Sequence, residues 1–383
     1  MSVVDNLKSQ EFVKIRRIIH QNPELAYCEF ETARFISEYL VECGIPVVTG
    51  LAKTGVVGTI EKEFAAETLL IRADMDALPI HEKTGLPFAS IKGAAMHACG
   101  HDAHVAIALG AAKNIMARKD ELKSNIKFVF QPAEESGNGA VALINDGVMD
   151  GNVTGAIALH VNPDVQVGTV TLKNGNRMAS NDSFEIILKG IGGHGACPTQ
   201  NSSITYVCAQ IVDNLYSVVT RKFHAAENAL ISICNIECGN TYNVMPSTAA
   251  IRGTIRTYSE DIRDVIPVYM EQIVGCIAAA YDVEHEFRLK KGHPPVVNDI
   301  GMVKKAQDAA EGVAQVNWLE RPSMTSDDFA YYAHRVPACY IGLGCGNVAK
   351  GITHPLHSEY FDLDEDCIQV GVNFLTNFAL TFS

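Results

Sequence analysis

The sequence is short of positive charge. It has 31 lysine and arginine residues against 44 acidic ones, which gives a formal net charge of -13 at pH 7. Such a chain is repelled by nucleic-acid phosphates and by anionic lipid headgroups, so we expect neither nucleic acid nor membrane as a partner. A small anionic substrate is not excluded, because a binding site can be locally positive.

Long apolar runs are missing as well. No stretch reaches the roughly 20 residues that a membrane-spanning helix needs. Residues 1–8 hold no apolar run behind a basic start, so we expect no signal peptide. The 11 cysteines are odd in number and lie scattered through apolar segments, a pattern typical of reduced thiols in a cytoplasmic protein. At 383 residues and 47% hydrophobic content, the chain can build two domains with real cores.

Strand and helix patterns alternate along the first 180 residues. Two helices are expected within residues 8–43, and the first carries Phe12, Ile15, Ile18 and Ile19 at helical spacing. An amphipathic helix is expected after residue 104. Strands are expected at 55–60, 68–74, 125–130 and 155–159. This alternation predicts an α/β domain with a mainly parallel sheet.

The pattern changes near residue 180. Strands at 183–189, 229–236, 248–257 and 283–290 alternate with helices at 202–220 and 264–281. The order β-α-β-β-α-β predicts a ferredoxin-like α+β domain inserted into the α/β domain. We therefore expect a first part of the α/β domain at residues 1–180, an inserted domain at 181–292, and a second part of the α/β domain at 293–383.

The segment Met96–His104 concentrates chemistry-bearing side chains. It holds three histidines, a cysteine and an aspartate within nine positions. Imidazole nitrogen and thiolate sulfur are ligands that zinc, nickel, cobalt or manganese sites use. Taken alone, the segment could also be a helix start whose polar groups are only caps.

Other ligand-type residues follow predicted strands. Asp74 and Asp76 follow one strand, Glu134 and Glu135 another, and His160 a third. Each has a simpler explanation by itself, a solvated acidic turn or a buried histidine. Because ligands bind outside the carboxyl ends of strands in open α/β sheets, their joint occurrence predicts that they converge on one site.

Five features of the chain carry a family resemblance. They are Arg72–Pro79, Met96–His104, Gln131–Glu135, Gly192–Ala196 and His357. In identity and order they resemble the metal-dependent amidohydrolase family of hippurate hydrolases, N-acyl-amino-acid deacylases (aminoacylases), N-acetyl-diaminopimelate deacetylases and plant auxin-conjugate (IAA-amino acid) hydrolases. The resemblance spans nearly the whole chain.

The resemblance implies a dinuclear-metal hydrolase domain and a lid that also forms a dimer or tetramer interface. It implies two divalent ions per chain, with five metal ligands: Cys99, His101, Glu135, His160 and His357. Glu134 would be the general base, and His194 a lid residue that reaches an active site, that of the partner subunit. Asn243 and Arg256 resemble lid positions that hold a substrate carboxylate, although a strand-surface charge explains Arg256 equally well.

The sequence departs from the related carboxypeptidases and aminopeptidases at one point. Those have His-x-Asp after the first strand and an aspartate that bridges the metals, whereas here Asp74 takes the histidine's place. The thiolate of Cys99 favours softer ions but does not choose among zinc, manganese, nickel and cobalt. Asp76 is expected to orient a ligand. His97 and His104 match no ligand position.

The expected reaction is hydrolysis of an N-acyl amino acid, N-acetyl or hippurate-like, by a metal-activated water. Glu134 would move the proton and His194 would help to stabilise the oxyanion. A dipeptidase, carboxypeptidase or aminopeptidase using the same site is the nearest alternative. A thiol amidase with Cys99 as nucleophile and a silent binding protein also stay open, although the latter would be expected to have lost a ligand or the base, and none is missing.

Overall fold

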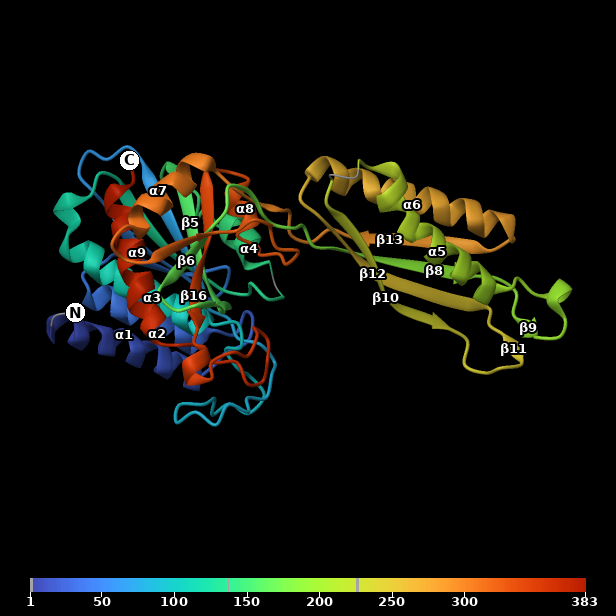
Figure 1. Cartoon of the computed structure of the whole chain (residues 1–383), viewed down its shortest axis with the longest axis horizontal. Helices are drawn as coiled ribbons and strands as arrows, with labels where there is room; N and C mark the ends of the chain where they lie inside the picture. Colours follow the sequence, from blue (N-terminus) through green and yellow to red (C-terminus); the bar gives the residue numbers. More distant parts are fainter. Residues whose placement is uncertain (1–2, 137, 225–226) are drawn as a thin grey trace. The chain divides into compact units, whose positions relative to one another are not determined.

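The computed structural model describes residues 3–136, 138–224 and 227–383. The chain forms two compact units (Figure 1), of which unit 1 comprises Met1–Arg177, Val297–Arg321 and Asp328–Ser383. Unit 2 comprises Met178–Val296 and Pro322–Asp327. The expected insertion, residues 181–292, falls inside unit 2, and the separate segment Pro322–Asp327 in that unit had no signal in the sequence.

An eight-stranded sheet forms the centre of unit 1, with the order β1-β2-β4-β3-β5-β16-β6-β15. The central strands β4, β3, β5 and β16 run parallel, whereas β1 and β2 form an antiparallel edge and β6 is antiparallel to β16. The mainly parallel α/β sheet is confirmed. The strand bounds are β1 Val47–Leu51, β2 Gly55–Ile60, β3 Thr68–Asp74, β4 Asn125–Gln131, β5 Val153–Gln166, β6 Thr169–Leu172, β15 Gln315–Trp318 and β16 Ala338–Gly346.

Helices cover both faces of this sheet. Leu69 and Ile71 of β3 belong to one core with the long helices, while Leu70 between them is equally buried outside that core. The short helices contact the sheet at β4 and β16. Burial on both faces explains why the strands are almost continuously apolar. The helix bounds are α1 Val3–Gln21, α2 Phe30–Glu42, α3 His101–Ala117, α4 Gly139–Asn145, α7 Ile300–Ala310, α8 Ala330–Ala333 and α9 Asp366–Thr381, with short 3₁₀ helices η1 Lys119–Glu121 and η3 Val348–Lys350.

Three details of unit 1 differ from the sequence-based expectation. Helix α3 is not amphipathic, because α1, α2, α9 and β3 pack around it and residues 101–112 are all buried. Strand β5 continues to Gln166, so His160 lies within a strand and not past its end. Ile18, expected on the apolar face of α1, is 49% exposed.

Unit 2 is a four-stranded antiparallel sheet with two long helices. The strand order β10-β12-β8-β13 and the connection β-α-β-β-α-β are those of the expected ferredoxin-like fold. Helices α5 and α6 lie on one side of the sheet (Figure 1) and share a core with alternate residues of β8, among them Phe184 and Ile186. The bounds are β8 Asp182–Lys189, α5 Ile204–Lys222, β10 Ala229–Cys238, β12 Thr248–Thr257, α6 Glu260–Ala280 and β13 Glu284–Lys290.

Smaller elements complete the two units. The strands β9 Gly193–His194 and β11 Val244–Met245 pair with each other, as do β7 Gly175–Met178 and β14 Val296–Asn298. A short 3₁₀ helix, η2, spans Pro198–Gln200. No helix in the described part of the chain is both long and apolar enough to cross a membrane.

Candidate metal centre

A glycine turn brings Cys99 and His101 together at the start of α3. Gly100 between them has a φ of +80°, a conformation that other residues adopt only at a cost. A Cβ atom at this position would lie 2.4 Å from Val161 Cγ2. Only glycine therefore allows the chain to turn here while packing against β5.

The ring of His101 is held by a hydrogen bond at one nitrogen, while the other nitrogen lies near two carboxylates without a hydrogen bond. Its Nδ1 lies 2.8 Å from the Asp76 carbonyl oxygen, to which it donates. Its Nε2 is buried and makes no hydrogen bond within the described residues. Because a backbone carbonyl can only accept, Nδ1 carries a proton, and in the neutral ring Nε2 presents a lone pair. This is the tautomer that a metal ligand needs.

Two buried carboxylates hold the loop that carries Glu134 and Glu135. Asp76 accepts the backbone N–H of Glu134 through Oδ1 and that of Glu135 through Oδ2, each at 3.1 Å. Glu29 accepts the N–H of Ala133 at 3.0 Å. Three successive amides are thus fixed, and Ala133 takes a left-handed φ of 55°. The orienting role expected of Asp76 acts on the Glu134–Glu135 backbone as well as on His101.

The role of Glu29 in holding this loop was not predicted from the sequence. It lies 104 residues from Ala133 in the chain, and an acid directly before a helix is common without any partner. Its side chain is buried, and it also accepts the hydroxyl of Thr54 at 2.7 Å. Burial raises the pKa of the Glu29 carboxyl, and the Thr54 hydrogen bond opposes that shift.

His160 and His357 reach the same place from distant parts of the chain. His160 donates from Nδ1 to the Val161 carbonyl oxygen at 2.8 Å, and its Nε2 lies 3.4 Å from Cys99 Sγ. The backbone N–H of His357 donates to the Ala98 carbonyl oxygen at 2.8 Å. The loop that carries His357 is thereby tied to the loop that carries Cys99.

The structure brings all five expected ligands and Glu134 into adjoining groups. Ligand atoms of Cys99, Glu135 and His357 lie within 4.8 Å of one another, and so do those of His101, Glu134 and Glu135. His160 adjoins Cys99. These residues were expected at strand ends and in loops, and they meet at the carboxyl edge of the parallel sheet. His160 is the exception to the strand-end expectation, because β5 continues past it.

The chemistry of this donor set fits a divalent metal ion. Glu135 Oε1 is buried without a hydrogen bond although it lies 3.3 Å from His357 Nε2 and 4.0 Å from His101 Nε2. Burial raises the pKa of the Cys99 thiol well above its usual range. A thiolate therefore needs a cation beside it, which a metal ion would provide. The same shift argues against Cys99 as a metal-free nucleophile.

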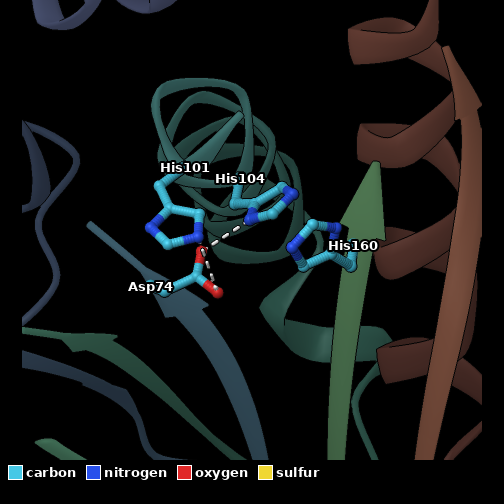
Figure 2. A group of neighbouring side chains, drawn as sticks. All are labelled: Asp74, His101, His104 and His160. Carbon is cyan, nitrogen blue, oxygen red and sulfur yellow. Dashed lines mark hydrogen bonds and ion pairs between the residues drawn. The ribbon is translucent and has the colours of Figure 1, made fainter. Parts of the chain in front are cut away.

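A second group of ligand-type residues combines two expected ligands, His101 and His160, with a hydrogen-bonded pair, Asp74 and His104. Figure 2 shows Asp74 between His101 and His104, with His160 beyond. The ligand atoms of all four lie within 4.8 Å of one another. However, His104 uses Nδ1 for Asp74 at 2.5 Å and Nε2 for the Val161 N–H at 3.0 Å. His104 thus has no lone pair left for a metal.

His97 stands apart from these groups. Both of its ring nitrogens are buried without a hydrogen bond in the described part of the chain. Burial lowers the pKa of His97 to about 3, so the ring is neutral at physiological pH. Its ring lies 6.4 Å from that of His20 and belongs to none of the ligand groups.

Two of the expected lid residues lie side by side in unit 2. His194 is exposed in β9 and pairs with Val244, while Asn243 lies in the bend before β11 and not in a strand. The N–H of Ala196 donates to His194 Nδ1 at 3.1 Å. The ring proton therefore sits on Nε2, which makes that atom a hydrogen-bond donor.

Arg256 lies in the four-stranded sheet, near the end of β12 that is farther along the chain from Asn243. It is eight residues beyond Thr248 in β12, about 27 Å of extended chain. Its guanidinium donates to Ser326 Oγ at 3.3 Å, and burial lowers its pKa. Arg256 and Asn243 of one lid therefore cannot grip the same small carboxylate.

Fold and donor set together define a metal-dependent hydrolase of the α/β type with an inserted ferredoxin-like domain. The sequence from residue 70 to residue 381 matches the model of peptidase family M20/M25/M40. The chain belongs to this family, and it is a metal-dependent amidohydrolase.

Individual relatives match along their whole length. N-acetylcysteine deacetylase of Bacillus subtilis (strain 168) is 36% identical over 379 residues, covering 99% of this chain and 98% of the relative. Thermostable carboxypeptidase 1 of Saccharolobus solfataricus is 35% identical, and the match covers 100% of this chain and 100% of the relative. The crystal structure of the Bacillus subtilis YXEP protein, described as a dinuclear metal binding peptidase, is similar with a TM-score of 0.86 and 34% identity over 98% of each chain.

Proposed function

We propose that this protein hydrolyses N-acyl amino acids, N-acetyl or N-aroyl derivatives with a free carboxylate. The observation that carries the proposal is the cluster of buried donor atoms without hydrogen bonds, His101 Nε2 and Glu135 Oε1, directly beside Glu134. The deacetylase relative supports the acyl side of this assignment. The reaction adds water across the amide bond and yields a carboxylate and an ammonium group.

The proposed metal site takes two divalent ions of zinc, manganese, nickel or cobalt. Metal ions held there would lower the pKa of a bound water and polarise the acyl carbonyl. The proposed ligands are Cys99, His101, Glu135, His160 and His357. Asp76 keeps His101 and the Glu134–Glu135 backbone in place.

Glu134 moves the proton in the proposed mechanism. Its carboxylate takes a proton from the attacking water as the bond to the acyl carbon forms. It then gives that proton to the amide nitrogen, because an amine must be protonated to leave when the C–N bond breaks. A backbone held by Asp76 at 3.1 Å keeps the carboxylate aimed during both transfers.

His194 supplies a hydrogen-bond donor to the developing oxyanion. The Ala196 N–H on Nδ1 supports this role, because it leaves the ring proton on Nε2. We place His194 in the active site of a partner subunit within a homodimer or homotetramer formed through the lid. Asn243 lies in the bend before β11, whereas Arg256 lies near the C-terminal end of β12; this separation supports an arrangement in which they come to the substrate carboxylate from different subunits.

A carboxypeptidase is the second candidate. The relative from Saccharolobus solfataricus carries that name and matches over the whole chain. Peptide and acyl amide bonds are cleaved by the same chemistry, so the two candidates differ only in what the acyl pocket accepts. A panel of N-acetyl, N-benzoyl and N-aminoacyl amino acids, assayed with each added metal, ranks them by kcat/KM. Higher kcat/KM for dipeptides than for every N-acyl amino acid would overturn the deacylase assignment.

The pair Glu134 and Glu135 gives the direct test of mechanism. We expect Glu134→Gln to keep about two metal ions per chain and to lose at least 10²–10⁴-fold in kcat, as is typical when a general base is removed. We expect Glu135→Ala to lose bound metal, measured by elemental analysis after dialysis. The reverse pattern would exchange the two roles. A wild-type protein that binds no metal and gains no activity from added metals would overturn the proposal.

Mixing inactive variants tests the subunit arrangement. We expect His194→Ala to keep its metals and lose roughly 10²–10³-fold in kcat, the cost of one oxyanion donor. Mixed with Glu134→Gln, it should regain activity, because one site of the heterodimer then has both residues. If labelled subunits exchange but no activity returns, His194 does not act across the interface.

A further inference from the structure

His104 is buried in the first turn of α3 and engages both of its ring nitrogens. It is 2% exposed. Its Nδ1 lies 2.5 Å from Asp74 Oδ1, and its Nε2 lies 3.0 Å from the backbone nitrogen of Val161. A backbone N–H can only donate, so Nε2 accepts and the ring proton sits on Nδ1. The side chain thus links the end of β3 to the middle of β5.

The backbone contact falls where β5 loses a strand partner. The pairing of β3 with β5 ends at Arg72 and Ala158. Three residues later, the N–H of Val161 donates to His104, while the Val161 carbonyl oxygen accepts from His160 Nδ1 at 2.8 Å. Val161 is therefore held by one histidine at its N–H and by the other at its C=O.

The two rings also pack directly. The centroids of His104 and His160 are 4.5 Å apart, with the planes inclined at 65° (Figure 2). Asp74, which accepts the hydrogen bond from His104, also accepts one from Arg72. Arg72 in turn donates to Asp328 at 2.7 Å. Backbone and ring contacts leave His160 with Nε2 directed at Cys99 Sγ, 3.4 Å away.

We propose that His104, backed by Asp74, is a positioning residue that fixes His160 in the orientation in which it binds metal. This inference rests on the proposed function, in which His160 is a ligand. It assigns the third histidine of the segment Met96–His104 a role without a bond to the metal. Partners that orient a metal-bound histidine change metal affinity by about 10–100-fold when they are removed.

Three substitutions at position 104 separate the two hydrogen bonds. Gln places an oxygen near the position of Nε2 and can still accept from Val161. Asn reaches only toward Asp74, and Leu makes neither contact. We expect His104→Gln to bind Co²⁺ or Zn²⁺ within about threefold of wild type, and His104→Asn and His104→Leu to bind one ion per chain 10–100-fold more weakly. Calorimetric titration of the metal-free protein measures this without any assay of activity.

Two controls define what the outcomes mean. Ile115→Ala, at the far end of the same buried helix, destabilises the core and should leave both metal affinities unchanged. His160→Ala should lose one ion per chain. If wild type and His160→Ala bind alike, the proposed ligand set fails. If His160→Ala loses an ion but His104→Asn and His104→Leu bind both as tightly as wild type, the role of His104 fails.

Spectroscopy of the wild-type protein tests the same idea if His104→Asn or His104→Leu does not fold. With ¹⁵N-labelled histidine, His104 should show the neutral Nδ1–H tautomer, and Zn²⁺ should shift the nitrogen resonances of His101 and His160 but not those of His104. The His104→Gln spectrum assigns its resonances. A Zn²⁺-induced shift of His104 Nε2 as large as that of His160 would make His104 a ligand and overturn the proposal.

Discussion

Removing the Glu29 carboxyl tests whether a residue remote in the chain sets the geometry of the proposed metal centre. Glu29 accepts two hydrogen bonds, from Thr54 Oγ1 at 2.7 Å and from the Ala133 N–H at 3.0 Å, and all three groups are buried. In Glu29→Ala both donors lose their partner. Each unsatisfied buried donor costs about 1–3 kcal/mol, so the free energy of unfolding should fall by about 2–6 kcal/mol.

Glu29→Gln is the matched control. The amide oxygen can accept from Ala133 while its NH₂ group donates to the Thr54 hydroxyl. Because burial raises the pKa of Glu29, the structure already disfavours the charged carboxylate, and a neutral amide of the same shape should cost only about 1 kcal/mol. Thr54→Val removes the hydroxyl bond alone and should leave the Ala133 contact intact.

Metal affinity distinguishes positioning from stability. Ala133 directly precedes Glu134 and Glu135, so loss of its anchor in Glu29→Ala should weaken metal binding by about 10–100-fold. Glu29→Gln and Thr54→Val should bind metal as wild type does. Urea unfolding and calorimetric titration measure the two effects separately. Wild-type metal affinity in a folded Glu29→Ala protein, or equal damage by Gln and Ala, would refute the reasoning.

Two further predictions concern stability. Arg263 and Asp182 form a buried bidentate pair in unit 2, with N–O distances of 2.7 and 2.8 Å, so Arg263→Ala should lower the free energy of urea unfolding by about 3–5 kcal/mol; a loss below about 1 kcal/mol would contradict this. Burial lowers the pKa of His20, but the charge of Asp102 and hydrogen bonds to Asp102 and Glu82 outweigh it, so the folded pKa lies above the unfolded one. The stabilisation from His20 is therefore complete below about pH 6.5 and is lost as pH rises through the folded pKa, by up to about 1.4 kcal/mol per pH unit; the stability difference between wild type and His20→Gln should shrink from pH 6 to pH 9.

Sequence patterns alone were sufficient for much of the fold. Strand-helix alternation predicted the mainly parallel sheet, and the change of pattern near residue 180 predicted a ferredoxin-like unit. These features are local, since hydrophobic periodicity records which face of each element is buried. The same logic misjudged α3, because a helix enclosed on all sides carries no polar stripe to reveal it. The sequence pattern also ended β5 too early, at His160. A histidine after an apolar run resembles the end of a strand as long as the residues that it contacts in space are unknown.

Residue type and motif order predicted the candidate ligands and the general base, but not the hydrogen bonds that orient them. Cys99, His101 and His104 are equivalent in the sequence as ligand-type residues of one segment. The resemblance separated them by motif position, but the physical reason is tertiary, because folding supplies the partner of each nitrogen: a carbonyl for His101 Nδ1, and two partners for His104, which leave it no lone pair. Glu29 became visible for the same reason, since a hydrogen bond between residues 104 positions apart has no trace in local sequence. The amino-acid sequence determines which metal-ligand atoms are present, whereas the direction of each lone pair depends on contacts that exist only after folding.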